Sequence, residues 1–145
     1  MKVKQIMSAP VIGIRPEESV EVAARTLAHY NIGALPVCDS KGKLCGLVTD
    51  RDLVTRCLAA NRSPQQMTVS QVMTGQVLSV QPDTDCGVAA HLMGKRQVRR
   101  LPVVENGKVC GMISLGDLAC RGEDNLDAAD ALSDIAANVS HGENW

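Results

Sequence analysis

A hydroxyl residue stands three positions before an aspartate at two places in the chain, each time after a short apolar run. The pairs are Thr49 with Asp52 and Ser114 with Asp117. A hydroxyl and an acid at this spacing can form a capping box, in which each side chain accepts a hydrogen bond from the other residue's backbone N–H at a helix start. The same corner suits a nucleotide, because N–H groups at a helix N-terminus hold phosphate and a carboxylate can accept both ribose hydroxyls.

Two features beside these pairs favour a ligand over a cap alone. Gly46 and Gly111 begin the apolar runs and are expected to leave room for a bound molecule. The tripeptide Leu-Pro-Val precedes each run, at 35–37 and at 101–103. We therefore expect a β-hairpin before each motif and a helix after it.

Other kinds of chemistry have little support in the sequence. The chain lacks a nucleophile elbow, a Walker loop, a dinucleotide Gly-x-Gly and a metal-ligand cluster. Its six cysteines contain no Cys-x-x-Cys pair, so we expect reduced thiols that pack as small apolar side chains. The sequence thus predicts neither an enzyme nor a protein that requires a metal or a cofactor.

Composition and charge exclude several classes of protein. The 145 residues are 45% hydrophobic and 21% charged, as in ordinary globular proteins. A net charge of −1 gives no general attraction to nucleic acid or anionic lipid, and one Tyr, one Trp and no Phe leave no platform for stacking bases. No run approaches the roughly 18 apolar residues that a membrane span needs. Because the start also lacks a signal peptide's apolar core, we expect a cytoplasmic protein.

The motifs belong to an internal repeat. Residues 3–53 match residues 69–118 at an offset of 66 that falls to 65 after one deletion. Each copy is predicted to contain a leading strand (Val11–Ile14 or Val77–Val80), an amphipathic helix, a hairpin and a second helix. One copy of about 50 residues is near the lower limit for a self-supporting core. The predicted fold is therefore α/β of the α+β type, with two β-α-β-β-α repeats packed as a pseudo-symmetric pair.

The repeats also set the expected boundaries. Beyond them, Leu132, Ile135, Ala136 and Val139 fall on one face of a predicted helix over 125–139. The predicted organisation is a first repeat at 1–60, a linker at 61–67, a second repeat at 68–121 and a C-terminal helical tail at 122–145.

The hydroxyl-x-x-Asp motif after a glycine-led strand, with a Leu-Pro-Val strand upstream, resembles the CBS (cystathionine-β-synthase) domain. Two in tandem resemble a Bateman module, and the similarity covers residues 3–120. The resemblance implies a stand-alone regulatory module that binds AMP, ADP, ATP, NAD or S-adenosylmethionine in a cleft between the repeats and acts on an unidentified protein. It also implies a homodimer, to which the small residues on the predicted helix faces would contribute by allowing close packing.

The resemblance further implies roles for individual residues. Asp52 and Asp117 match ribose-binding aspartates, and Thr49 and Ser114 match hydroxyls near the phosphate. The other implied positions are Gly13 and Ser79 on the leading strands, Ala34, Arg99 and Arg100 before Leu-Pro-Val, and Arg51 within the first motif.

Positive charge for a phosphate is split unevenly between the copies. Residues 95–100 carry four cations, whereas the first copy has no Lys or Arg at 28–34. Lys95 and Arg96 are expected to offset a helix dipole. Because neighbouring strand residues face opposite ways, only one of the two arginines before Leu-Pro-Val should reach the ligand. We expect the second copy to bind phosphate-bearing ligands more tightly, unless Arg51 supplies charge to the first.

Two other functions compete with a nucleotide-binding module. A redox-responsive interaction protein would use some of the cysteines, although Cys45 and Cys110 share one repeat position and Cys86 lies on an apolar helix face, as packing residues do. A nucleic-acid-binding protein would use the cationic cluster, against the near-neutral net charge.

Overall fold

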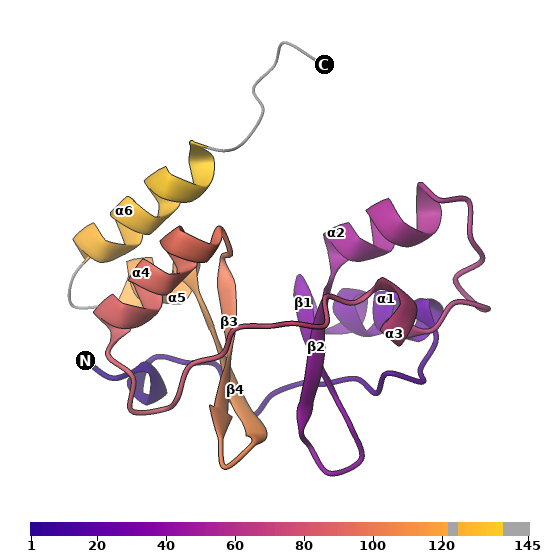
Figure 1. The fold of residues 1–145 in the computed structure, drawn as a ribbon, viewed down its shortest axis with the longest axis horizontal. Coiled ribbons are helices and arrows are strands. Elements are labelled where there is room, and N and C mark those ends of the chain that lie inside the picture. The colour runs from indigo at the N-terminus through magenta and orange to yellow at the C-terminus, as the bar shows by residue number, and fades with distance from the viewer. Residues whose placement is uncertain (122–124, 138–145) are drawn as a thin grey trace. The chain divides into compact units, whose positions relative to one another are not determined.

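The computed structural model describes residues 1–121 and 125–137 of the chain. The described chain divides into two compact units (Figure 1). Unit 1 contains Met1–Pro10, Ser79–Glu105 and the described residues from Cys110 onward, and unit 2 contains Val11–Leu78 and Asn106–Val109. Neither unit is a continuous stretch of sequence.

Unit 2 holds the helices and the hairpin of the first repeat. They are α1 (Val20–Tyr30), β1 (Ala34–Cys38), β2 (Leu44–Thr49), α2 (Asp50–Leu53) and a π-helical turn, η2 (Val54–Leu58). The short helix α3 (Val69–Val72), from the start of the second repeat, completes the unit.

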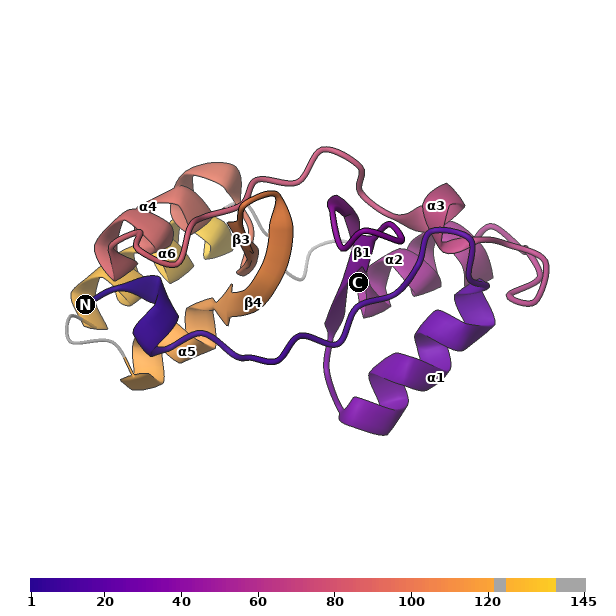
Figure 2. The ribbon, with the colours of Figure 1, turned by 90° about the horizontal axis from the view of Figure 1, so that it is seen from below.

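Unit 1 has the same helix-strand-strand-helix order, with a short helical turn before it and a further helix after it (Figure 1, Figure 2). Its elements are η1 (Val3–Gln5), α4 (Cys86–Arg96), β3 (Arg100–Glu105), β4 (Lys108–Ser114), α5 (Leu115–Arg121) and α6 (Asn125–Ala136), apart from the hairpin tip at 106–109. This element order confirms the predicted α+β fold. Among the described residues, no helix combines the length and the apolar character that crossing a bilayer requires.

Local sequence sets the ends of several elements. The Ser19 hydroxyl accepts a backbone hydrogen bond of 3.2 Å at the start of α1. Helices α1 and α4 end at Asn31 and Gln97, whose φ angles of 53° and 59° are left-handed and stop a helix. In the second hairpin Asn106 and Gly107 both have positive φ, as the predicted tight turn requires.

Each predicted leading strand is reduced to one residue pair. Ile14 forms a parallel bridge to Val37, and Val80 forms one to Val103. The two hydrogen bonds of each bridge measure 3.0 and 2.9 Å at Ile14 and 3.0 and 2.8 Å at Val80. Each sheet therefore has two full strands and a one-residue third strand at its β1 or β3 edge.

The other edge of each hairpin is bridged by a segment from the other repeat. We call residues 1–10 and 68–78 the leading segments. Leu47 of β2 exchanges backbone hydrogen bonds of 3.0 and 2.9 Å with Thr74, and Met112 of β4 exchanges bonds of 2.8 and 3.1 Å with the first leading segment. Each leading segment thus packs in the unit built mainly from the other repeat.

Gly46 and Gly111 accommodate this exchange, which corrects the expectation that they leave room for a ligand. A Cβ at Gly46 would lie 2.6 Å from the carbonyl oxygen of Thr74 and 2.7 Å from Met73 Sδ. A Cβ at Gly111 would lie 2.5 Å from Met7 Sδ. The space beside both glycines is filled by the leading segments.

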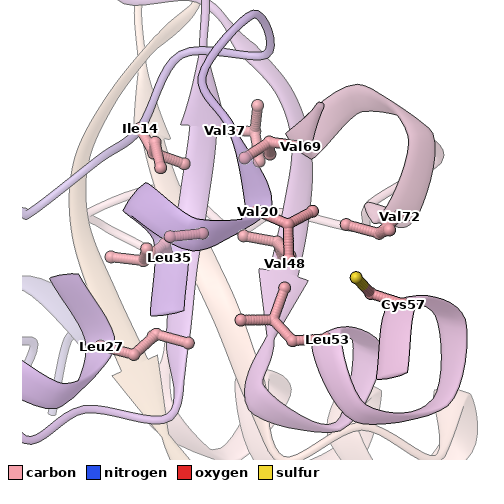
Figure 3. Packing of buried hydrophobic residues seen from close by; sticks show 11 residues of the cluster. Ile14, Val20, Leu27, Leu35, Val37, Val48, Leu53, Cys57, Val69 and Val72 are labelled. Carbon is pink, nitrogen blue, oxygen red and sulfur yellow. The ribbon is translucent and has the colours of Figure 1, made fainter. Parts of the chain in front are cut away.

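The hydrophobic core of unit 2 includes side chains from the exchanged segment. Val69 and Val72 are fully buried in one cluster with Val48 of β2 (Figure 3). In unit 1, Val3 and Ile6 stand at the equivalent repeat positions and are also buried. The core of each unit therefore draws on both repeats.

The C-terminal tail forms the predicted helix as far as it is described. Helix α6 packs on α4 and α5 in unit 1, with Ala128, Ala131 and Ile135 buried. Leu132, which the periodicity places on the buried face, is 45% exposed, so that assignment is wrong. The docked face is centred on alanines, because α6 approaches α4 too closely for a larger side chain. Val139 lies outside the described residues.

Gly46→Ala is expected to destabilise the protein by about 1–3 kcal/mol, because the added methyl group overpacks against the second leading segment. Urea unfolding measures the loss. Gly75→Ala is the matched control, since a Cβ there meets nothing within 4 Å. If the two variants had the same free energy of unfolding, the second leading segment could move away from β2 without any loss of stability.

Candidate functional site

The first motif forms a closed corner where β2 ends and α2 begins. The Thr49 N–H donates to Asp52 Oδ2 at 2.9 Å, and the Asp52 N–H donates to the Thr49 hydroxyl at 3.1 Å. Both residues are half-buried. The second carboxylate oxygen, Asp52 Oδ1, lies 3.9 Å from Arg56 Nε. The corner is therefore a complete capping box with a cation beside its outer oxygen.

The second motif repeats this corner where β4 ends and α5 begins. The Ser114 N–H donates to Asp117 Oδ2 at 2.9 Å, and the Asp117 N–H donates to the Ser114 hydroxyl at 3.0 Å. No side chain or backbone group in the described part of the chain makes a hydrogen bond or ion pair with Asp117 Oδ1. That oxygen is available to accept a hydrogen bond from a ligand.

A backbone hydrogen bond ties the start of each hairpin to its corner. The Asp50 N–H donates to the Gly33 carbonyl at 3.0 Å, and the Leu115 N–H donates to the Arg99 carbonyl at 2.8 Å. Ala34 also pairs with the corner hydroxyl residue across β1 and β2. The residues just before Leu-Pro-Val therefore lie at the hydroxyl end of each hairpin.

The two corners differ in the number and burial of the basic side chains near them. Arg100 begins β3 and is half-buried, whereas Arg99 is exposed. The two basic residues in the last turn of α4 are exposed, where positive charge offsets the helix dipole. In unit 2 the buried Ala34 takes the position of Arg100, and Arg51 is exposed on α2. Unit 1 thus has the more cationic hairpin start.

The two leading-strand positions, Gly13 and Ser79, each come directly before the residue that bridges to the hairpin. Ser79 is half-buried and precedes Val80, which bridges to β3. Gly13 lines an open pocket of about 270 Å³ together with Cys38 at the far end of β1. The bridge between Ile14 and Val37 sets Gly13 beside Pro36, in the middle of β1. The same register sets Ser79 beside Pro102 of β3, so the two leading-strand positions are structurally equivalent.

Sequence reasoning missed two arginines at equivalent repeat positions. Arg56 Nη1 donates to the carbonyls of Val72 and Met73 at 3.0 and 3.1 Å, and Arg121 Nη1 donates to the carbonyl of Ile6 at 3.3 Å. Each arginine binds the end of the short helix in an exchanged leading segment. The sequence repeat could have identified them, because the two arginines are 65 positions apart, as are the two motif aspartates.

The six cysteines are free thiols. Burial raises the pKa of Cys38, with smaller effects from Cys45 and Asp39, and burial also raises the pKa of Cys110. A raised pKa lowers the fraction of thiolate at neutral pH, and thiolate is the reactive form. The environment of these two thiols therefore disfavours a redox role for them.

The family model for the CBS domain matches residues 3–59 and 69–121, which are the two repeats. The uncharacterized protein YlbB of Bacillus subtilis (strain 168) is 39% identical over 145 residues, covering 99% of this chain and 97% of that protein. Similarity thus extends over nearly the whole length of both chains.

Solved structures of other proteins share the fold. The CBS domain pair of protein MJ0100, solved in complex with 5′-methylthioadenosine and S-adenosyl-L-methionine, matches with a TM-score of 0.75 and 32% identity over 82% of this chain and 93% of that one. Hypoxic Response Protein I with two coordinated zinc ions matches with a TM-score of 0.78 and 30% identity over 83% and 98%. Within residues 1–121 and 125–137 of the present chain, no three His, Cys, Asp or Glu side chains are grouped to hold a metal ion.

Thr49→Val is expected to lower the free energy of unfolding by about 1 kcal/mol, because it removes the hydroxyl that accepts the Asp52 N–H while keeping the side-chain volume. Thr49→Ser keeps the hydroxyl and should lose clearly less stability. Chemical denaturation compares the two. The cap would contribute nothing if the Val and Ser variants unfolded at the same denaturant concentration.

Proposed function

The chain belongs to the CBS domain family, and we propose that it is a regulatory module that binds an adenosine-containing ligand and catalyses no reaction. One observation carries this proposal. In unit 1 the Leu115 N–H is bonded to the Arg99 carbonyl, so that Ser114, Asp117 and the arginine pair lie at one end of one hairpin.

Each group at this end suits one part of such a ligand. Asp117 Oδ2 serves the cap, and Oδ1 is left to accept a ribose hydroxyl. The Ser114 hydroxyl accepts the Asp117 N–H and keeps its own proton to donate to a phosphate oxygen. Arg100 is half-buried and can form charge-assisted hydrogen bonds to phosphate. The set therefore favours AMP, ADP, ATP or NAD over a nucleoside without phosphate.

The ligands of MJ0100 support the adenosine part of the proposal. That protein, at 32% identity, holds 5′-methylthioadenosine and S-adenosyl-L-methionine, both of which contain the adenosine framework. The ligand would act as a regulatory signal to a partner protein, with no metal or other cofactor required.

The first repeat should be the weaker site. Its corner has the same hydroxyl and carboxylate geometry, but Ala34 replaces Arg100 and Asp52 Oδ1 has Arg56 nearby. Ribose recognition is shared by the two repeats, whereas phosphate recognition belongs mainly to the second.

Asp117→Ala is expected to remove the tighter of two binding events, and Asp52→Ala the weaker one. Isothermal titration with AMP and ATP measures both. The two variants are matched, because each loses the same capping bond along with the proposed ribose acceptor. A larger loss for Asp52→Ala would reverse the ranking, and no loss for either would leave both motifs as helix caps only.

Arg100→Ala is expected to weaken AMP and ATP binding by roughly ten- to a hundredfold while changing adenosine binding little, since a charged hydrogen bond contributes about 1.5–3 kcal/mol. Arg96→Ala removes the same charge from the exposed end of α4 and is the control. Equal effects of both substitutions would mean that Arg100 acts only through long-range charge.

A further inference from the structure

The two corners differ at the residue that directly follows the motif hydroxyl. It is Asp50 in the first repeat and Leu115 in the second. Asp50 is exposed, whereas Leu115 is 8% exposed and belongs to the hydrophobic core. The first corner therefore carries a solvent-facing carboxylate at a position where the second carries a buried apolar side chain.

Two hydrogen bonds fix where the Asp50 carboxylate lies. Asp50 Oδ1 accepts the Arg51 N–H at 2.8 Å, and the Thr49 hydroxyl accepts the N–H of the next residue, Asp52, at 3.1 Å. Because these two acceptors bind neighbouring backbone N–H groups, the carboxylate lies beside the hydroxyl. In the proposed ligand site this hydroxyl faces the 5′ group of the ligand. A phosphate there would meet a like charge.

The charges around the two corners differ in the same sense. The first corner spans residues 33–34 and 49–56, and the second spans residues 99–100 and 114–121. In the first, Arg56 is engaged by carbonyls of the second leading segment and lies beside Asp52. Arg51 is the other cation there, and Asp50 is the other acid. The first corner is therefore neutral, whereas three arginines and one acid give the second a net charge of +2.

Adenosine derivatives differ most in charge at their 5′ group. The phosphate of AMP carries about two negative charges at neutral pH. 5′-Methylthioadenosine has an uncharged thioether in its place, and S-adenosyl-L-methionine has a sulfonium cation. A neutral corner with a carboxylate beside the 5′ group disfavours the phosphate and accommodates the other two groups.

We propose that the first corner selects adenosine derivatives with an uncharged or cationic 5′ group, that the second selects those with a phosphate, and that Asp50 sets this difference. The inference rests on the proposed function and deepens it, because it assigns a separate ligand class to each repeat. One chain would then respond to two kinds of adenosine compound.

Isothermal titration of the full chain with AMP and 5′-methylthioadenosine tests the two preferences. Asp117→Ala leaves the proposed ribose acceptor of the first corner alone, and Asp52→Ala leaves that of the second. The Asp117→Ala chain should bind 5′-methylthioadenosine more tightly than AMP, and the Asp52→Ala chain should show the reverse order. Circular dichroism verifies that both variants are folded.

Asp50→Asn, added to Asp117→Ala, tests the role of the charge. The amide oxygen of asparagine can still accept the Arg51 N–H, so the substitution removes the charge and keeps the hydrogen bond. AMP binding should strengthen by about two- to fivefold, as expected for an exposed charge, while 5′-methylthioadenosine binding stays nearly constant. Asp130→Asn removes an exposed carboxylate from α6 and is the matched control, with no expected effect on either ligand.

The same substitution in the otherwise wild-type chain should strengthen only the weaker AMP binding event, so the test does not depend on the stability of the Asp117→Ala chain. A first corner that prefers AMP would overturn the proposal, as would an AMP affinity that Asp50→Asn leaves unchanged or that Asp130→Asn raises equally. An Asp117→Ala chain that binds neither compound would overturn it too, while AMP binding by the Asp52→Ala chain would still support the proposed function. If neither chain bound either compound, the proposed function itself would be wrong.

Discussion

The exchange of the leading segments is the contact on which the rest of the structure depends. The backbone at Thr74 reaches β2 only because Gly46 has no side chain, and the first leading segment reaches β4 in the same way at Gly111. This contact satisfies backbone groups on a strand edge that would otherwise be unpaired. It also brings Val69 and Val72 into the core of unit 2. Each unit is complete only when both repeats are present.

The candidate site takes its rigidity from the same exchange. Arg56 and Arg121, on the helices that follow the motifs, bind carbonyls of the leading segments. Each corner is therefore tied to its hairpin on one side and to an exchanged segment on the other. A carboxylate held in one orientation costs less entropy when it binds a ligand. The capping bond and the proposed ribose acceptor use different oxygens of one aspartate, so the two interpretations of the motif do not exclude each other.

Features controlled by nearby residues were predictable from the sequence. The capping boxes and the Asn-Gly turn follow from short spacings, whereas the grouping of Arg99 with Ser114 was implied by the family resemblance. The hairpin that each leading segment joins was not predictable, because the repeats share an apolar pattern and the segment suits either one locally. The expectation of space for a ligand beside Gly46 is wrong for that reason. Leu132 was misplaced because periodicity favours a large apolar residue, whereas close contact with α4 favours alanine.

The exchanged segments also bear on how such a chain could arise. In a single repeat on its own, the leading segment would have no hairpin to pair with. The strand that contains Gly46 or Gly111 would also have an unpaired edge. Two identical single-repeat chains could satisfy both needs by trading segments, which would make them an intertwined dimer with no stable separate monomer. Gene duplication and fusion would turn that concentration-dependent assembly into a unimolecular one. Once fused, the copies could diverge, so that one has arginine where the other has alanine at the same repeat position.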